Sequence, residues 1–227
     1  MFLEAKNLRK SFGDGRVRAV DGVSFSLGKG RTLGVMGESG SGKSTLAKLV
    51  LRLLPLDSGE IFFEGQRIDS LKEKGLKYFR KKVQVVFQDP YLSLDPRMTV
   101  REILAEPFLI NGQRGRNSLN KKVSGLLTSV ELPEAFVSRL PHELSGGECQ
   151  RVAIARAIST DPELIICDEA VSALDLLVQA QILNLLLKLQ NETGMSYIFI
   201  SHDLRVVRHM SDEILVMKDG YGRITAL

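Results

Sequence analysis

The stretch Gly37-Glu38-Ser39-Gly40-Ser41-Gly42-Lys43-Ser44-Thr45 decides the fold class of this 227-residue chain. It matches the pattern G-x-x-x-x-G-K-[ST], a glycine-rich loop between a strand and a helix. An apolar run at 32–36 precedes it, and residues 44–54 have the pattern of a helix. Inward-facing N–H groups at the positive end of a helix bind phosphate. We therefore expect these nine residues to hold a nucleotide, with Lys43 at the β- and γ-phosphates and the Ser44 hydroxyl on Mg²⁺.

Other apolar runs predict an α/β domain with a mainly parallel core sheet. Central strands of such a sheet are apolar on both faces, and short apolar runs occur at 83–87, 164–167 and 197–200. A helix is expected at 176–190, between the last two runs. Strands that alternate with helices favour the α/β class.

Two additions to this core are expected. Predicted strands separated by glycine-containing turns, at 3–11, 23–27 and 60–63, indicate an N-terminal antiparallel β subdomain. The middle of the chain has almost no strand signal but has helix-like segments at 100–110 and 121–130. We predict one domain over 1–227, with the core and β subdomain in 1–88 and 158–227 and an inserted helical lobe in 89–157.

Composition excludes several classes of protein. The two cysteines, Cys149 and Cys167, suggest no disulfide framework or metal motif, as in a reducing compartment. No apolar run is long enough for a transmembrane helix, and the N-terminus lacks the apolar stretch of a signal peptide. The net charge of +4 is small enough to be a solvated surface rather than a nucleic-acid footprint. We expect a protein that does not itself cross a membrane.

Two carboxylates follow the apolar run at 164–167. Ligands bind at the carboxyl ends of parallel strands, which is where Asp168 and Glu169 are expected to lie. Asp168 is predicted to hold Mg²⁺ beside Ser44. Glu169, one residue later, can project differently and polarise an attacking water as a general base.

The segment Leu144-Ser145-Gly146-Gly147-Glu148 resembles the LSGGQ signature of ABC (ATP-binding cassette) ATPases. The resemblance implies a P-loop NTPase of the ABC cassette type, with ATP and Mg²⁺ as ligands. It also implies that Ser145, Gly146, Gly147 and Glu148 close on the ATP held by a second cassette. The chain departs from the family pattern at Glu148, where glutamine is usual, and at Ala170, where proline is usual.

The same resemblance assigns roles to residues elsewhere in the chain. Gln88 resembles the Q-loop glutamine, at Mg²⁺ or the attacking water, and Asp175 belongs to a D-loop. His202 resembles the switch histidine, which donates to the γ-phosphate, and Phe12 the aromatic residue that stacks on adenine. With Glu169 and Lys43, Gln88 and His202 form the expected catalytic set.

Residues 89–100 resemble the nickel/oligopeptide importer branch of this family. Here Tyr91, Leu92 and Leu94 are expected to form an exposed apolar surface for a permease helix. The chain ends at Leu227 without the extension common in peptide transporters, which slightly favours a metal cargo. The implied protein lies peripherally at the cytoplasmic face of the cell membrane. Its implied partners are transmembrane permeases, a second ATPase subunit (identical or different) and, indirectly, a solute-binding protein, and no nucleic acid is expected.

Two other functions stay open at this point. A soluble ABC-type ATPase acting on nucleic acid or ribosomes usually has two cassettes or long coiled coils, and neither is evident in the sequence. A regulatory module that senses ATP without hydrolysing it predicts the loss of Lys43, Glu169 or His202, and all three are present.

Overall fold

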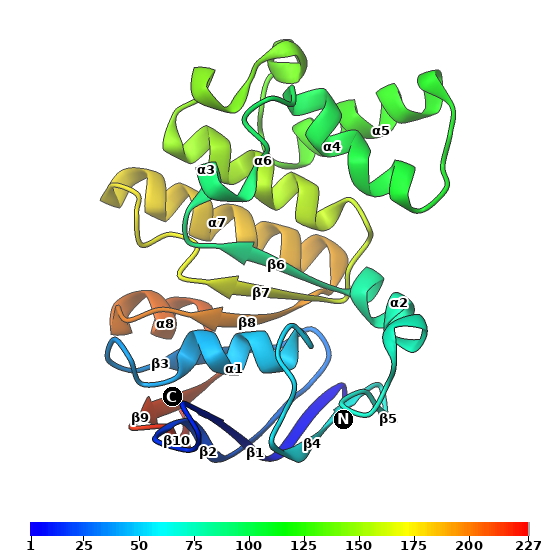
Figure 1. Ribbon diagram of the computed structural model, residues 1–227. Helices are drawn as coiled ribbons and strands as arrows, with labels where there is room; N and C mark the ends of the chain where they lie inside the picture. The colour runs from blue at the N-terminus through cyan, green and yellow to red at the C-terminus, as the bar shows by residue number, and fades with distance from the viewer. Residues whose placement is uncertain (227) are drawn as a thin grey trace. The chain divides into compact units, whose positions relative to one another are not determined.

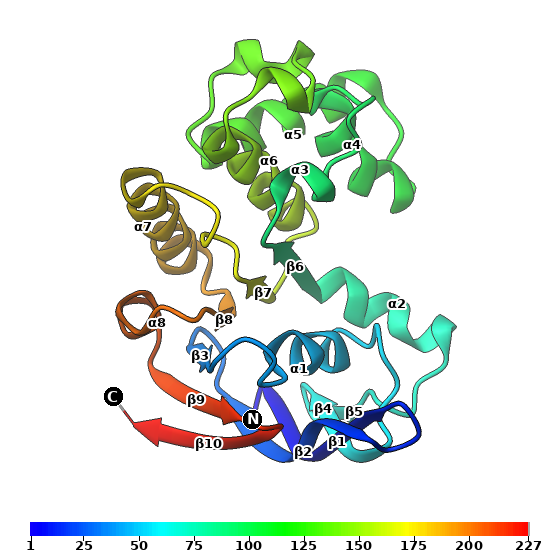
Figure 2. The same ribbon diagram turned by 60° about the vertical axis from the view of Figure 1, so that its left-hand side comes forward.

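The computed structural model describes residues 1–226, which form two compact units (Figures 1 and 2). The first unit consists of Met1–Gln84, Glu163–Glu169 and the chain from Gly194 onward. The second consists of Val85–Pro162 and Ala170–Thr193. Residues 89–157 all lie in the second unit, which also contains the helix α7 (Leu176–Thr193). The predicted domain bounds stay a prediction.

An antiparallel sheet forms one part of the first unit, as predicted. Its strand order is β2 (Val17–Leu27), β1 (Leu3–Phe12), β4 (Ser58–Phe63) and β5 (Gln66–Arg67). Leu3 is paired with Leu27 on one side and with Phe63 on the other, and all three side chains are buried. This alignment places the apolar face of the sheet in the core.

A second, mostly parallel sheet carries the predicted apolar strands. β3 (Thr32–Met36) runs parallel to β8 (Ser196–Ile200) and to β9 (Glu213–Lys218), and β8 runs parallel to β7 (Leu164–Asp168). β10 (Tyr221–Ala226) is antiparallel to β9 at one edge, and β6 (Val83–Phe87) lies at the other edge. Residues 164–167 and 197–200 are buried, which explains their unbroken apolar sequence.

Three helices complete the first unit: α1 (Lys43–Val50), α2 (Glu73–Lys82) and α8 (Leu204–Met210). α1 follows β3 directly, as the glycine-rich loop predicts, but it ends four residues before the expected Leu54. Buried Leu46, Leu49 and Val50 form its core-facing side.

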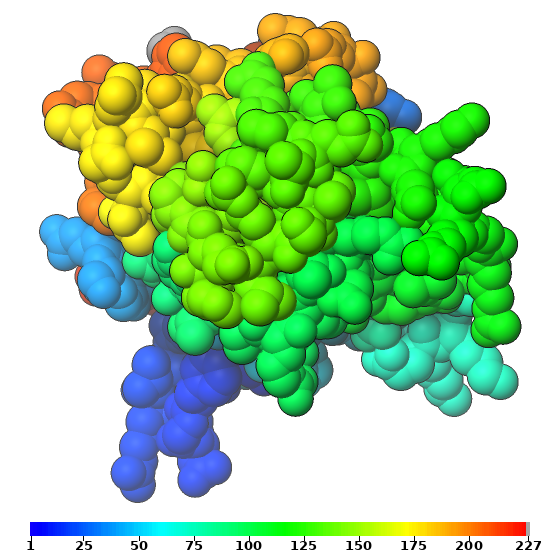
Figure 3. Space-filling view, turned by 90° about the horizontal axis from the view of Figure 1, so that it is seen from above, coloured from blue at the N-terminus to red at the C-terminus, as the bar shows by residue number. Residues whose placement is uncertain are grey.

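The second unit is helical apart from its share of β6, as predicted for the middle of the chain. Its elements are α3 (Pro90–Ser93), α4 (Val100–Ile110), α5 (Arg116–Ser129), α6 (Gly146–Ile158), α7 and two 3₁₀ helices (Glu134–Ser138 and Pro141–Glu143). The predicted helix at 100–110 has the predicted bounds, whereas α5 begins five residues before the expected 121. The space-filling view draws residues of this unit in green to yellow (Figure 3).

One sequence-based expectation for this unit is wrong. Tyr91 and Leu92 are exposed, at 45% and 87%, but Leu94 is 3% exposed and belongs to the core. The segment also forms the short helix α3 rather than an open loop. A chain that turns after one helical turn brings residue 94 back to the interior, so the apolar surface is limited to Tyr91 and Leu92.

None of the helices within residues 1–226 combines the length and the apolar character needed to span a membrane.

Candidate functional site

The glycine-rich loop forms a backbone cradle in the first unit. Gly42 is the N-cap of α1, has φ of 103°, and provides no side-chain cap. The first intrahelical bond is Leu46 N–H to Gly42 C=O, at 2.8 Å, so the N–H groups of residues 43–45 precede the helical ladder. A Cβ at Gly42 would lie 2.0 Å from the Ala19 carbonyl oxygen, and one at Gly37 would lie 2.3 Å from that of Met217. Glycine is therefore required at both positions by close backbone approach.

The side chains of this loop fit an anionic ligand. Lys43 is 5% exposed, and its Nζ donates to the carbonyl oxygens of Gly37 and Glu38, each at 2.8 Å. Within residues 1–226 the buried Ser41 hydroxyl has no hydrogen-bond partner, which is unusual for a buried polar atom. The Lys43 ammonium, which contacts backbone carbonyls, can bind phosphate oxygens. The Ser41 hydroxyl is likewise suited to donate to a phosphate oxygen. The remaining loop residues differ in exposure: Glu38, Ser39, Gly40 and Ser44 are exposed, and Gly37, Gly42 and Thr45 are half-buried.

Asp168, the last residue of β7, lies beside the start of α1. Its Oδ1 accepts a hydrogen bond from the Ser44 hydroxyl at 3.2 Å. Burial raises the pKa of Asp168, and the neighbouring carboxylate of Glu169 adds to this effect. A hydroxyl and a carboxylate are hard oxygen donors of the kind that Mg²⁺ takes from proteins. A cation there would relieve the excess of negative charge, so the donor set fits the expected ion.

Glu169 has a left-handed backbone, with φ of 51°. Such a conformation is uncommon outside glycine and often occurs at functional sites. The Glu169 N–H donates to the Ile200 carbonyl at 3.0 Å, which ties the residue to β8. Oε2 of Glu169 lies 3.5 Å from Nδ1 of His202, just past the end of β8. The two residues thus face each other across the ends of adjacent parallel strands.

Phe12 ends β1 and is 41% exposed. The Nζ of Lys10 lies 5.7 Å from the ring centroid, and the same amine pairs with Asp57 at 2.6 Å. An exposed ring held at a strand end is suited to stacking, as expected for an adenine base.

The other predicted site residues lie in the second unit. Ser145 is the N-cap of α6, and Glu148 completes a capping box, because the Ser145 N–H donates to Glu148 Oε2 at 2.8 Å and the Glu148 N–H donates to Ser145 Oγ at 3.3 Å. Glutamine can make the same bond, so the departure at Glu148 preserves the helix start. Gly147 has no room for a side chain, since a Cβ would lie 2.4 Å from Val178 Cγ1.

Three further predicted residues of this unit lie at element ends. Asp175 accepts from the N–H groups of Leu177 and Val178, both at 3.1 Å, and so caps the start of α7. Gln88 is exposed and comes directly after β6. Gly146, between Ser145 and Gly147, begins α6.

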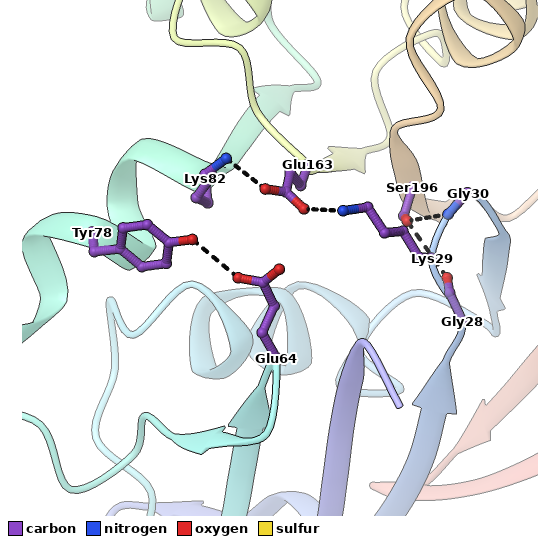
Figure 4. A network of polar contacts seen from close by, with 8 residues as sticks. All are labelled: Gly28, Lys29, Gly30, Glu64, Tyr78, Lys82, Glu163 and Ser196. Atoms are coloured by element: carbon purple, nitrogen blue, oxygen red, sulfur yellow. Dashed lines mark hydrogen bonds and ion pairs between the residues drawn. The ribbon is translucent and has the colours of Figure 1, made fainter.

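Sequence reasoning missed a polar network at the other ends of the strands (Figure 4). Glu163, just before β7, accepts from Lys29 at 2.6 Å and from Lys82 at 2.5 Å. These two hydrogen bonds hold the pKa of Glu163 below its usual range. Nearby, Tyr78 donates to Glu64 and the Gly30 N–H donates to Ser196 Oγ. The members are up to 168 positions apart in the chain, so no local spacing could have indicated them.

A family model described as "ABC transporter" matches residues 20–172. The chain belongs to the ABC transporter family. Its relatives include the oligopeptide transport ATP-binding protein AppF of Bacillus subtilis (strain 168), 54% identical over 207 residues. They also include the dipeptide transport ATP-binding protein DppF of Escherichia coli (strain K12), 48% identical over 204 residues. These matches cover 91% and 90% of this chain, but only 63% and 61% of the relatives, so the ABC chain spans under two thirds of their length.

A solved structure confirms the ABC fold. The dimeric, post-hydrolysis ATP-binding cassette MJ0796, bound to ADP and Pi, superposes with a TM-score of 0.89 and 32% identity. The match covers 100% of this chain and 99% of that one. The predicted fold class, an ABC cassette with antiparallel and mainly parallel sheets and a set of helices, is therefore confirmed.

Proposed function

We propose that this chain binds and hydrolyses ATP as the motor subunit of an importer for oligopeptides or dipeptides. The observation that carries the proposal is the cluster in the first unit, where the phosphate loop lies with Ser44 against Asp168 and Glu169 faces His202. The relatives named above transport peptides, which favours a peptide cargo over the metal cargo that the sequence slightly favoured. They also favour transport over action on nucleic acid or ribosomes.

Catalysis is assigned to this chain's residues as follows. The loop N–H groups and the Lys43 ammonium bind the phosphates and stabilise negative charge as it develops. Mg²⁺, when held by Ser44 and Asp168, neutralises phosphate charge. Glu169 orients a water and accepts its proton, and His202 donates a hydrogen bond to the γ-phosphate. The rigid left-handed turn at Glu169 fixes where its carboxylate can reach.

The residues of the second unit have proposed partners outside the chain. The start of α6, at Ser145 to Glu148, is assigned to the ATP held by a second cassette, identical or different, and Asp175 to the same interface. Gln88 is assigned to the ATP or Mg²⁺ of its own subunit. Tyr91 and Leu92 are proposed to contact a transmembrane permease, which would hold the protein at the cytoplasmic face of the cell membrane. A solute-binding protein would act on the permease.

Glu169→Gln tests the catalytic assignment. The amide keeps the size of the side chain but cannot accept the proton, so we expect ATP to bind as before and hydrolysis to fall about 10²–10⁴-fold. Glu213→Gln is the matched control, because it removes an exposed carboxylate at the start of β9. Nucleotide titration and phosphate release are measured for both variants. Hydrolysis by Glu169→Gln at the parent rate would exclude Glu169 as the base, and a parent that neither binds nor hydrolyses ATP would refute the proposal.

A further inference from the structure

The short helix α3, which follows Gln88, is bonded at one end to the residue before the N-cap of α6 and at the other end to a residue within α6. At its start, the Tyr91 hydroxyl donates a hydrogen bond to the Leu144 carbonyl at 3.1 Å. At its end, Arg156 Nη1 donates to the Ser93 carbonyl at 3.0 Å. Both contacts lie within the second unit, and they link segments 53 and 63 positions apart in the chain.

The attached segment has little internal freedom. Asp89 caps α3, accepting from the N–H groups of Tyr91 and Leu92 at 2.9 and 3.2 Å. The Ser93 hydroxyl donates back to the Asp89 carbonyl at 2.8 Å, and Leu94 is buried in the core. A displacement of residue 89, next to Gln88, would therefore be transmitted to Tyr91 rather than absorbed by a flexible loop.

The Leu144 carbonyl is the point where this segment reaches the start of α6. Its peptide group leads directly into Ser145, the residue whose side chain and backbone form the capping box with Glu148. A shift of the Leu144 carbonyl rotates that same peptide unit, since the peptide bond is planar. Tyr91 is thus one hydrogen bond away from the residue that presents α6 to a second cassette.

We propose that the Tyr91 hydroxyl couples the two ATP sites of a cassette dimer. The inference rests on the proposed function, in which Gln88 belongs to the ATP site of its own subunit and Ser145 to that of the partner. In this proposal, ATP in the subunit's own site restrains Gln88. The α3 segment transmits this restraint to Tyr91. The hydrogen bond from Tyr91 to the Leu144 carbonyl then positions Ser145 for the ATP held by the partner subunit. Tyr91 is assigned as a positioning residue, because it acts on Ser145 through the Leu144 carbonyl.

Tyr91 contacts the Leu144 carbonyl through its hydroxyl group rather than through its ring. The ring is partly exposed, while the hydroxyl lies near Cys149 and the Leu144 carbonyl. Burial raises the pKa of the Tyr91 phenol, so it stays a hydrogen-bond donor at neutral pH. A Tyr91→Phe change therefore removes the bond and keeps the apolar surface that a permease would contact.

Tyr91→Phe is compared with Tyr78→Phe, which removes a phenol that donates to the side-chain carboxylate of Glu64 in the first unit. The working dimer, whether of one chain or two, is assayed for hydrolysis over a range of ATP concentrations. For Tyr91→Phe we expect the Hill coefficient to fall toward 1 and kcat to fall about three- to ten-fold, as for the loss of one hydrogen bond. ATP binding by the isolated subunit should not change, and Tyr78→Phe should behave as the parent does.

The change in amide hydrogen exchange at residues 144–149 on ATP binding provides a readout of the coupling, because a loss of stability alone would speed exchange with and without ATP. ATP binding should slow exchange there in the parent and in Tyr78→Phe, at a protein concentration too low for dimers, but not in Tyr91→Phe. Arg156→Met loosens the other end of α3 and should reduce the same response. An unchanged Hill coefficient and exchange response in Tyr91→Phe would overturn the proposal, as would a parent that hydrolyses ATP without cooperativity. Absence of ATP hydrolysis in the parent would instead refute the proposed function.

Discussion

Replacing Gly147 by alanine puts a methyl group into the contact between α6 and α7. The new Cβ would lie 2.4 Å from Val178 Cγ1, more than 1 Å closer than the optimal carbon separation of about 3.5–4.0 Å. Valine in a helix has one strongly preferred rotamer, so the Val178 Cγ1 methyl group cannot rotate away freely from the new Cβ. Overpacking of this kind costs about 1–3 kcal/mol, and the better helix preference of alanine returns at most about 1 kcal/mol. We expect a net loss of about 1–2 kcal/mol in the free energy of unfolding.

The double variant Gly147→Ala/Val178→Ala separates this clash from other effects. Val178→Ala removes the Cγ1 atom, so Gly147→Ala should cost much less in that background, with a coupling energy of about 1 kcal/mol or more. Urea unfolding of the parent, the two single variants and the double variant gives the free energies for this double-mutant cycle. ATP hydrolysis should fall in Gly147→Ala and recover in part in the double variant, because the clash displaces the start of α6. The reasoning is refuted if Gly147→Ala is as stable as the parent, or if it costs the same with and without Val178.

Three further outcomes are expected. Lys43→Ala should lose most ATP affinity, measured by titration, because it removes the loop's cation; unchanged affinity would contradict the assignment. Leu92→Asp should stay folded and lose co-purification with a permease, whereas Leu94→Asp should unfold, because an unpaired carboxylate is costly in the core; circular dichroism distinguishes them. The pKa of Glu163 is depressed in the folded state, so its ion pairs stabilise the fold above the ordinary glutamate pKa and are lost as pH falls through the folded value. The difference in thermal midpoint between the parent and Glu163→Gln should therefore shrink on acidification below about pH 4.5, and a constant difference would contradict this.

The sequence was most informative where one residue type dominates an element. β3, β7 and β8 were predicted because buried parallel strands are apolar throughout. β9 and β10 were missed: β9 begins and ends with a charge and β10 contains arginine, so neither gives such a run. α2 was missed as well, because six of its ten residues are charged and it has only two buried positions, Leu76 and Phe79.

The site shows the same division between local and non-local information. The glycine-rich loop is a contiguous pattern, and parallel strands place Asp168 at the same carboxyl edge of the sheet as this loop. The left-handed backbone of Glu169 and the link from Tyr91 to Leu144 depend on distant parts of the chain, and no spacing encodes them. Leu94 was misplaced because a single apolar residue in a proline-bounded segment has no periodicity to show its orientation.

Glu169 is subject to two independent constraints: its backbone has a positive φ, and its side chain is assigned as the general base. A selection for folded protein alone should rank substitutions there by tolerance of the left-handed region, with glycine and asparagine near the top and β-branched residues at the bottom. A selection for ATP turnover should reject glycine and asparagine too, since both lack a carboxylate. Comparing the two rankings in a saturation library would show how much of the sequence restriction at this position belongs to the backbone and how much to the chemistry.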